Sequence, residues 1–368
     1  MVFIVVIGLL IIQVLLFLGH FWLYKTLVRF LVITNPGILL AIKISLGILS
    51  ICFVIASVIA FRYYNKFTQI FYSFSAGWMG FFNFLFLALC LFWLVFAIGK
   101  IFSITLNWKY LLSFLLFAAI FLGTYGLINA SNVRLTKINV LLKNMPENWK
   151  GKKAVWVSDI HLGQIRNDAF AQRLVKMINE QKPDIVFVGG DLYDGVAIDE
   201  QKMANYFSSI NAPLGKYFIT GNHEEFGDDT KYLAAIKNSK IKILDNEMVN
   251  INGLQLIGVD YTTATKPEDF KKILKGLQID QTKPSILLKH TPFLLDIAEA
   301  QGINFQISGH THKGQFPPFS WITNLVYKGY DFGFKRYGKM QIYTSSGAGT
   351  WGPPMRVGTI PEIVSITF

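Results

Sequence analysis

The chain has 368 residues, of which 52% are hydrophobic and 16% are charged, and its formal net charge is +12. An ordinary soluble protein carries about 25% charged residues, so this composition excludes a chain that is soluble throughout. The deficit is local: residues 1–130 contain seven Lys or Arg and no Asp or Glu, whereas the remainder holds 28 basic and 23 acidic side chains. More than half of the positive charge therefore lies beside apolar runs, as it does next to membrane spans, and no nucleic-acid partner is expected.

Four apolar segments in the first third of the chain are long enough to cross a bilayer, which requires about 20 residues. They are Met1–Tyr24, Leu39–Phe61, Tyr72–Gly99 and Tyr110–Ser131. Basic residues follow them, and aromatic residues cluster at their ends as they do at membrane interfaces. Because no acidic residue lies in any of these segments, we expect residues 1–131 to be a four-span anchor without chemistry of its own. Lipid recognition by the bundle is the main alternative.

The orientation in the cell membrane is predicted from a small charge difference. The two sets of loops carry five basic residues each, so their count does not distinguish the sides. The first span is followed by Lys25 and Arg29 and preceded by no basic residue, which favours an N-terminus outside the cell. Four spans return the chain to its starting side, so the C-terminal part is predicted to be extracytoplasmic. Cys52 and Cys90 lie in apolar runs and are interpreted as small hydrophobic residues of helices.

After the spans, residues 132–150 are predicted to be a linker and residues 151–368 a globular domain. Short apolar strands are expected at 154–157, 185–188, 217–219, 241–244, 286–288, 305–307 and 342–343. Helical patterns fall at 168–181, 200–210, 230–238, 267–276 and 293–300. The dipeptide Asn252-Gly253 between two further apolar runs indicates a β-hairpin. Strands that alternate with helices indicate an α/β fold with a β-sheet core flanked by helices.

Five of the six histidines lie in short polar clusters that directly follow predicted strands. In chain order the clusters are residues 158–161, 190–195, 221–224, 289–292 and 309–312. The C-terminal ends of strands in an open α/β sheet meet at one edge, so the clusters are expected to converge there. Side chains two apart on an extended segment share a face. Asp159 with His161, and His310 with His312, can therefore each present two ligands in one direction.

Together the clusters supply carboxylates, an amide and up to five imidazoles. This mixture of oxygen and nitrogen donors suits Mn, Fe or Zn rather than Ca or Mg alone. The donors outnumber the three or four ligands that one catalytic zinc needs, so we predict two divalent metal ions. The C-terminal part has no cysteine and offers no thiolate nucleophile.

The motif order D-x-H, GD-x-x-D, GNH-E, H and GH-x-H resembles the calcineurin-like metallophosphoesterases. The resemblance covers residues 150–368 and not the spans. The segments Gly314-Gln315, Ser345–Gly349 and Pro353–Val357 are similar to those of a bacterial membrane-associated and exported subgroup. Lys313 departs from this subgroup, which usually has glycine there, and adds a cation beside the site.

The resemblance implies a metal ligand set that uses most of the cluster residues. One ion would be held by Asp159, His161 and His312, the second by Asn222, His290 and His310, and Asp191 would bridge both.

The resemblance also implies roles for residues that do not bind metal. His223 would be the proton donor of catalysis, and Asp194 would orient it. Glu224 is expected to be structural. Arg166 and Arg356 are candidates for contact with a substrate phosphate, although solvated surface positions are favoured for both.

The expected activity is hydrolysis of a phosphomonoester or phosphodiester by a metal-bridging hydroxide, because paired cations lower the pKa of bound water towards neutrality. The predicted anchor favours a lipid head group or nucleotide-linked lipid as substrate. The alternatives are a catalytically silent metal-binding sensor or scaffold, a transporter with an accessory domain, and a nuclease. The unaltered His223 and Asn222 count against the sensor or scaffold. The near absence of ionisable residues in the spans counts against the transporter, and the lack of a basic aromatic groove counts against the nuclease.

Overall fold

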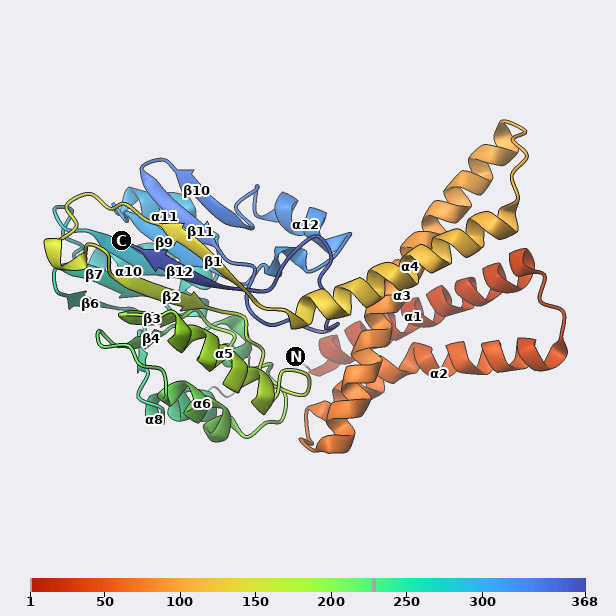
Figure 1. The fold of residues 1–368 in the computed structure, drawn as a ribbon, viewed down its shortest axis with the longest axis horizontal. Helices are drawn as coiled ribbons and strands as arrows, with labels where there is room; N and C mark the ends of the chain where they lie inside the picture. The colour runs from red at the N-terminus through yellow and green to blue at the C-terminus, as the bar shows by residue number, and fades with distance from the viewer. Residues whose placement is uncertain (1, 227–229) are drawn as a thin grey trace. The chain divides into compact units, whose positions relative to one another are not determined.

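A computed structural model describes residues 2–226 and 230–368. The chain divides into two compact units, drawn as ribbons in Figure 1. The helical unit comprises the residues up to Ile128 together with Gly352–Met355. The C-terminal unit comprises Asn129–Trp351 and Arg356–Phe368. The division therefore falls within the last turns of the fourth apolar helix and not after it.

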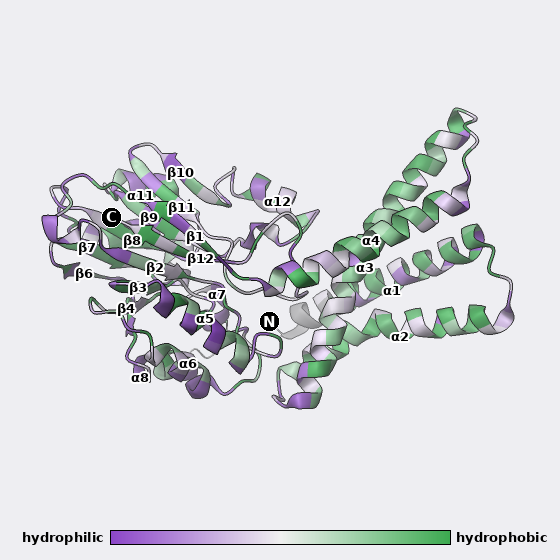
Figure 2. Cartoon of the chain, viewed as in Figure 1, coloured by the Kyte–Doolittle hydropathy of each residue, from purple (hydrophilic) through white to green (hydrophobic). Residues whose placement is uncertain are grey.

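The helical unit is built from four long helices. They are α1 (Val2–Leu31), α2 (Pro36–Ala60), α3 (Lys66–Ile101) and α4 (Trp108–Ser131). Within the described residues, these four are long and apolar enough to cross a membrane, and Figure 2 shows that most of their residues are hydrophobic. Each expected span corresponds to one of them, although Met1 lies outside the described residues. The side chains of Asn35 and Asn65 accept backbone N–H groups at the starts of α2 and α3 and so define where these helices begin.

Polar side chains of α1 and α3 pair with one another. Trp78 Nε1 donates to His20 Nε2 at 3.0 Å, and Trp93 Nε1 donates to Thr26 Oγ1 at 3.1 Å. The ring of His20 also stacks on Phe82, with centroids 3.8 Å apart. Such hydrogen bonds satisfy polar groups in an apolar environment and join neighbouring helices. His20 and Thr26 of α1 therefore have a structural explanation.

Among the described residues, two six-stranded mixed sheets form the frame of the C-terminal unit. The first sheet has the order β1 (Arg134–Asn139), β12 (Glu362–Thr367), β2 (Lys153–Val157), β3 (Ile185–Val188), β4 (Lys216–Phe218), β5 (Lys242–Ile243). The second has the order β10 (Gly333–Tyr337), β11 (Met340–Thr344), β9 (Phe305–Ser308), β8 (Ser285–Leu288), β7 (Leu254–Gly258), β6 (Glu247–Ile251). Strands β2 to β5 are parallel to one another, and so are β7, β8, β9 and β11. The predicted β-sheet core is confirmed, in the form of two sheets and not one open sheet.

The main hydrophobic core lies between the two sheets. Trp156 and Phe187 of the first sheet belong to the same buried cluster as Leu256, Ile286 and Phe305 of the second. Full burial of large apolar side chains contributes roughly 1.5–3 kcal/mol each. This packing holds the strand ends of the two sheets in a fixed relation, and these ends carry the polar clusters.

Helices flank the sheets, as predicted. They are α5 (Asp168–Glu180), α6 (Glu200–Ser208), α7 (Asn222–Glu225), α8 (Thr230–Asn238), α9 (Tyr261–Thr265), α10 (Pro267–Gly276), α11 (Leu295–Ala300) and α12 (Phe319–Val326). The five expected helices correspond to α5, α6, α8, α10 and α11, and the expected hairpin is formed by β6 and β7. The segment 132–150, expected to be a linker, contains β1, which pairs in parallel with β12 along its whole length. Strand β10 and helix α12 were also not predicted.

Candidate metal centre

Each polar cluster follows a strand, and the clusters come from both sheets. Asp159 and His161 follow β2, Asp191 and Asp194 follow β3, Asn222 and His223 begin α7 after β4, His290 follows β8, and His310 and His312 follow β9. The packing of the two sheets therefore brings together side chains that the sequence separates by more than 150 positions.

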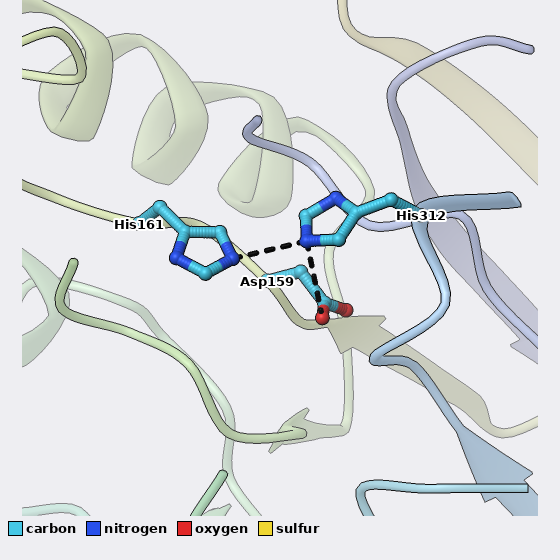
Figure 3. Close-up of side chains that lie close together, drawn as sticks. All are labelled: Asp159, His161 and His312. Atoms are coloured by element: carbon cyan, nitrogen blue, oxygen red, sulfur yellow. Dashed lines mark hydrogen bonds and ion pairs between the residues drawn. The ribbon is translucent and has the colours of Figure 1, made fainter. Parts of the chain in front are cut away.

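The first group of candidate ligands consists of Asp159, His161 and His312. Their ligand atoms lie within 4.8 Å of one another. Figure 3 shows the two imidazoles facing each other, with their Nε2 atoms 3.0 Å apart, and His312 Nε2 lies 3.7 Å from Asp159 Oδ1. All three side chains are buried. Two ring nitrogens and a carboxylate oxygen converge here on one point.

The second group consists of Asp191, His290 and His310, whose ligand atoms also lie within 4.8 Å of one another. His290 Nε2 is 3.3 Å from Asp191 Oδ2. The same carboxylate oxygen lies 3.8 Å from His161 Nε2 of the first group. Asp191 therefore stands between the two groups. Asn222 Oδ1 is buried nearby without a hydrogen-bond partner among the described residues.

The hydrogen bonds of His290 leave one of its ring nitrogens available to a metal ion. His290 Nδ1 lies 2.7 Å from the carbonyl oxygen of Gly189 and must carry the proton, because a carbonyl only accepts. In the neutral ring the Nε2 lone pair then faces the Asp191 carboxylate, and Nε2 has no hydrogen-bond partner in the described part of the chain. Two buried acceptors repel each other unless a proton or a metal cation lies between them. The donor set, with its nitrogen and oxygen atoms, is one that divalent transition metals accept.

The pKa values of the ionisable groups in the centre depend on burial and on the charges of their neighbours. Burial acts to lower the pKa of His290, but the carboxylate of Asp191 raises it to about 9. Burial lowers the pKa of His310 to about 3, and the charge of His290 acts in the same direction. Burial raises the pKa of Asp159. Burial acts in the same direction at Asp191, but His290, His161 and His223 together outweigh it, and the pKa of Asp191 falls well below its ordinary value. The site therefore favours positive charge next to Asp191.

Sharp backbone turns aim the ligands into the centre. A positive φ between 47° and 69° occurs at Asp159, His161, Asp191, His310 and His312. This left-handed region is uncommon for residues with a Cβ, and such conformations cluster at functional sites. Two glycines allow the close approach of the loops: a Cβ on Gly221 would overlap the Asp191 carboxylate, and one on Gly309 would overlap that of Asp159.

His223 lies beside the centre and is held through its main-chain and ring nitrogens. Its backbone N–H donates to Asp191 Oδ1 at 2.9 Å, and its Nδ1 lies 3.0 Å from the carbonyl oxygen of Asp194. The Asp194 carboxylate lies instead 3.4 Å from Nδ1 of His161. Asp194 therefore contacts His223 through its main chain and His161 through its side chain. Burial lowers the pKa of His223, and the charge of His161 lowers it further.

Glu224 supports the loop that carries Asp191. Its buried carboxylate accepts hydrogen bonds from the backbone N–H groups of Gly221, Asp191, Leu192 and Tyr193. Burial, followed by the charge of Asp191, raises its pKa to about 7. Four donors on one carboxylate explain why a charged residue occupies this buried position.

Arg166 and Arg356 are both buried, so the solvated surface positions expected for them are wrong. Arg356 Nη2 donates to the carbonyl oxygens of Ser346 and Gly349 at 2.7 and 2.6 Å and lies 3.2 Å from His312 Nδ1. Arg166 Nη2 donates to the carbonyl oxygen of Ala130 at 2.8 Å. Backbone carbonyls of the surrounding loops therefore replace water around Arg356, whereas Arg166 is held by the last turn of α4 and by the hydroxyl of Thr350.

Two supporting residues were missed. Ser158 Oγ donates to Asp159 Oδ2, and its place beside Asp159 in the first cluster was a signal for this role. The ring centroid of Tyr261 lies 6.0 Å from that of His290 and 6.1 Å from that of His310. Tyr261 was not marked in the sequence because the polar residues that follow β7, from Asp260 to Thr263, include no histidine.

Comparisons with known proteins support the family resemblance that the motifs indicate. Residues 152–314 match the family described as calcineurin-like phosphoesterase. An uncharacterized metallophosphoesterase of Helicobacter pylori strain J99 is 34% identical over 217 residues, which are 58% of this chain and 59% of that protein. An uncharacterized metallophosphoesterase of Aquifex aeolicus is 31% identical over 263 residues, 69% of this chain and 98% of that protein.

The name of one vertebrate relative includes both a transmembrane protein and a metallophosphoesterase domain. The Danio rerio protein named transmembrane protein with metallophosphoesterase domain is 30% identical over 265 residues, 67% of this chain and 60% of that protein. The chain thus spans about three fifths of the length of the Helicobacter and Danio relatives and nearly all of the Aquifex one. On this evidence the chain belongs to the calcineurin-like metallophosphoesterase family.

Proposed function

We propose that this chain is a membrane-anchored phosphoesterase that hydrolyses a phosphomonoester or phosphodiester with two divalent metal ions. The observation that carries the proposal is the pair of donor groups between which the Asp191 carboxylate stands. Family membership supports the same reaction class. The four apolar helices support the anchor.

The proposed ligand set divides between the two groups. One ion would be held by Asp159, His161 and His312, and the other by Asn222, His290 and His310, with Asp191 reaching both. When bound, the ions would supply Lewis acidity and lower the pKa of a water molecule towards neutrality. The backbone N–H of His223 fixes Oδ1 of Asp191 and leaves Oδ2 directed at His161 and His290.

His223 is the proposed proton donor to the leaving group. The carbonyl oxygen of Asp194 holds its Nδ1–H, so in the protonated ring the second proton lies on Nε2 and can be given to a substrate. Burial disfavours this protonated form, whereas the negative charge of a bound phosphate favours it. General acid catalysis of this kind typically contributes about 10²–10⁴-fold in rate.

The proposed substrate is membrane-borne, such as a lipid head group or a nucleotide-linked lipid. Helix α4 ends at Ser131 and β1 begins at Arg134, so the domain starts within about 10 Å of chain from the last proposed span. We propose that the protein lies in the cell membrane with the C-terminal unit outside the cytoplasm, because Lys25 and Arg29 lie towards the C-terminal end of α1.

An assay of the purified full-length protein with Mn²⁺ tests this function. The panel contains phospholipids, nucleotide-linked lipids and simple aryl phosphoesters, and His310→Ala protein prepared in parallel controls for contaminating phosphatases. We expect hydrolysis of at least one membrane phosphoester by the unsubstituted protein alone. Full metal occupancy without hydrolysis of any member would instead favour the metal-binding sensor.

A further inference from the structure

Helix α12 turns its apolar side towards solvent. The exposed fraction of its apolar side chains lies between 46% and 80%, for Phe319, Trp321, Ile322, Leu325 and Val326. At 100° per residue these five positions fall on one arc of roughly 160°. Ser320, Thr323 and Asn324 occupy the opposite side. A helix on the surface of a soluble domain has the reverse arrangement, with the apolar stripe against the core.

The polar side of α12 is fastened to the loop that carries the GH-x-H motif. Asn324 Nδ2 donates to Asp331 Oδ1 at 2.9 Å, and the carbonyl oxygen of Asp331 accepts from Thr311 Oγ1 at 2.7 Å. Thr311 separates the two histidines of that motif. Tyr327, directly after the helix, has its ring centroid 6.3 Å from that of His310. Helix α12 is therefore a fixed neighbour of the metal centre, so its outward apolar side is part of the folded domain.

The segment of chain that contains α12 is basic. From Lys313 to Lys339 the chain has five Lys or Arg and a single acid, Asp331, which is buried. Lys328 follows the helix closely, and Lys335 Nζ contacts the carbonyl oxygen of Gly329 next to it. An exposed apolar stripe bordered by Lys and Arg is the arrangement with which a helix lies in the surface of an anionic bilayer. Tryptophan is enriched at the same depth.

The position of α12 in its unit fits this partner. Figure 1 shows α12 at the end of the C-terminal unit where β1 begins. The last turn of α4 is held in this unit by hydrogen bonds: Asn129 Nδ2 donates to the carbonyl oxygens of Arg356 and Thr359 at 2.9 and 2.8 Å. If α4 spans the membrane, this short fixed attachment keeps that end of the unit within reach of lipid.

We propose that α12 is a membrane-docking helix that inserts Trp321, Ile322 and Leu325 into the surface of an anionic lipid bilayer. Because α12 is bonded to the GH-x-H loop, docking would hold the metal centre at the level of the lipid head groups. The inference rests on the proposed membrane anchoring and not on the proposed hydrolysis.

A fluorophore on α12 tests the docking in the full-length protein. Leu325→Cys is labelled with the environment-sensitive dye NBD in a Cys52→Ala, Cys90→Ala background and reconstituted into phosphatidylcholine–phosphatidylglycerol vesicles. Leu141→Cys is the matched control, since the two leucines are 80% and 82% exposed. Leu141 lies beyond the far end of β1, whose six residues extend about 20 Å away from α4. Flotation with the vesicles reports anchoring, and hydrolysis of a soluble aryl phosphoester reports the activity separately.

We expect the emission at position 325 to shift to the blue and to be quenched several-fold more than that at position 141 by lipids with a nitroxide near the head group. Equal quenching at the two positions in protein that floats would overturn the docking. A blue shift without quenching would also overturn it, because it would indicate contact with a second copy or another protein. If position 325 were quenched as strongly in vesicles of neutral lipid alone as in the anionic vesicles, the role given to the basic residues would be overturned. Protein that does not float would contradict the anchoring itself.

Discussion

At the scale of single residues, His223 and His310 separate proton transfer from metal binding. We predict that His223→Ala keeps both metal ions, because the Nδ1 of His223 is held by the Asp194 carbonyl and its proposed role is donation. The rate should fall by about 10²–10⁴-fold with a poor leaving group and far less with nitrophenolate, which needs no proton. Metal content and the rates with both substrates are the measurements.

The matched variant is His310→Ala, which removes a proposed ligand. A methyl group cannot replace an imidazole, so this variant should lose metal and with it activity towards every leaving group. Loss of metal in His223→Ala, or an equal loss of rate with both leaving groups, would show that His223 is not the donor.

The sequence predicted the site residues that directly follow strands. It did not predict the contacts of residues whose partners lie in loops. The clusters around Asp159 and His310 could be recognised because a strand end fixes where its next side chains lie. The burial of Arg356 could not, because its partners are carbonyl oxygens whose positions depend on how residues 345–360 fold. The contact between His223 and the main chain of Asp194 could not be predicted either, because its partner is also a carbonyl oxygen of a loop.

At the scale of elements, the end of α4 is joined to the C-terminal unit through Asn129. We predict that Asn129→Ala destabilises this unit by about 1–3 kcal/mol, because the carbonyl oxygens of Arg356 and Thr359 lose a buried donor. Thermal unfolding in detergent, followed by near-ultraviolet circular dichroism, measures the change. Asn144→Ala is the control, since Asn144 also donates to a carbonyl oxygen but is exposed. Equal effects of the two substitutions would contradict the structural role of Asn129.

Elements with strong periodicity were predicted, and those whose place depends on partners were not. Helices α5 and α10 bury one side and were found from their apolar spacing. Strand β1 lies in the segment predicted to be a linker. Only its pairing with β12 makes these six residues a strand. For α12 the spacing of apolar residues gives a stripe but cannot say whether the stripe faces the core or the solvent.

At the scale of the whole molecule, the orientation can be tested from the surface of the C-terminal unit. We predict that Lys143→Cys and Lys266→Cys, each in a background without Cys52 and Cys90, react with a membrane-impermeant maleimide in intact cells. Both positions are exposed, so folding does not hide them. Labelling of both only after lysis would place the unit in the cytoplasm.

The sequence indicates two parts of different composition, but it does not indicate the residues that belong to each compact unit. The absence of acids before Glu147 separates an apolar part from a mixed one. The assignment of Asn129 to the C-terminal unit and of Gly352–Met355 to the helical unit depends on contacts between distant segments, which no local composition records.

The metal content of the purified protein tests the central claim most directly. Elemental analysis of full-length protein should find two divalent ions per chain, because the Asp191 carboxylate stands between two donor groups. Removal by a chelator should reduce phosphoester hydrolysis to background, and Mn²⁺ should restore it. Full hydrolytic activity in protein whose metal content is measured as nil would contradict the two-metal account.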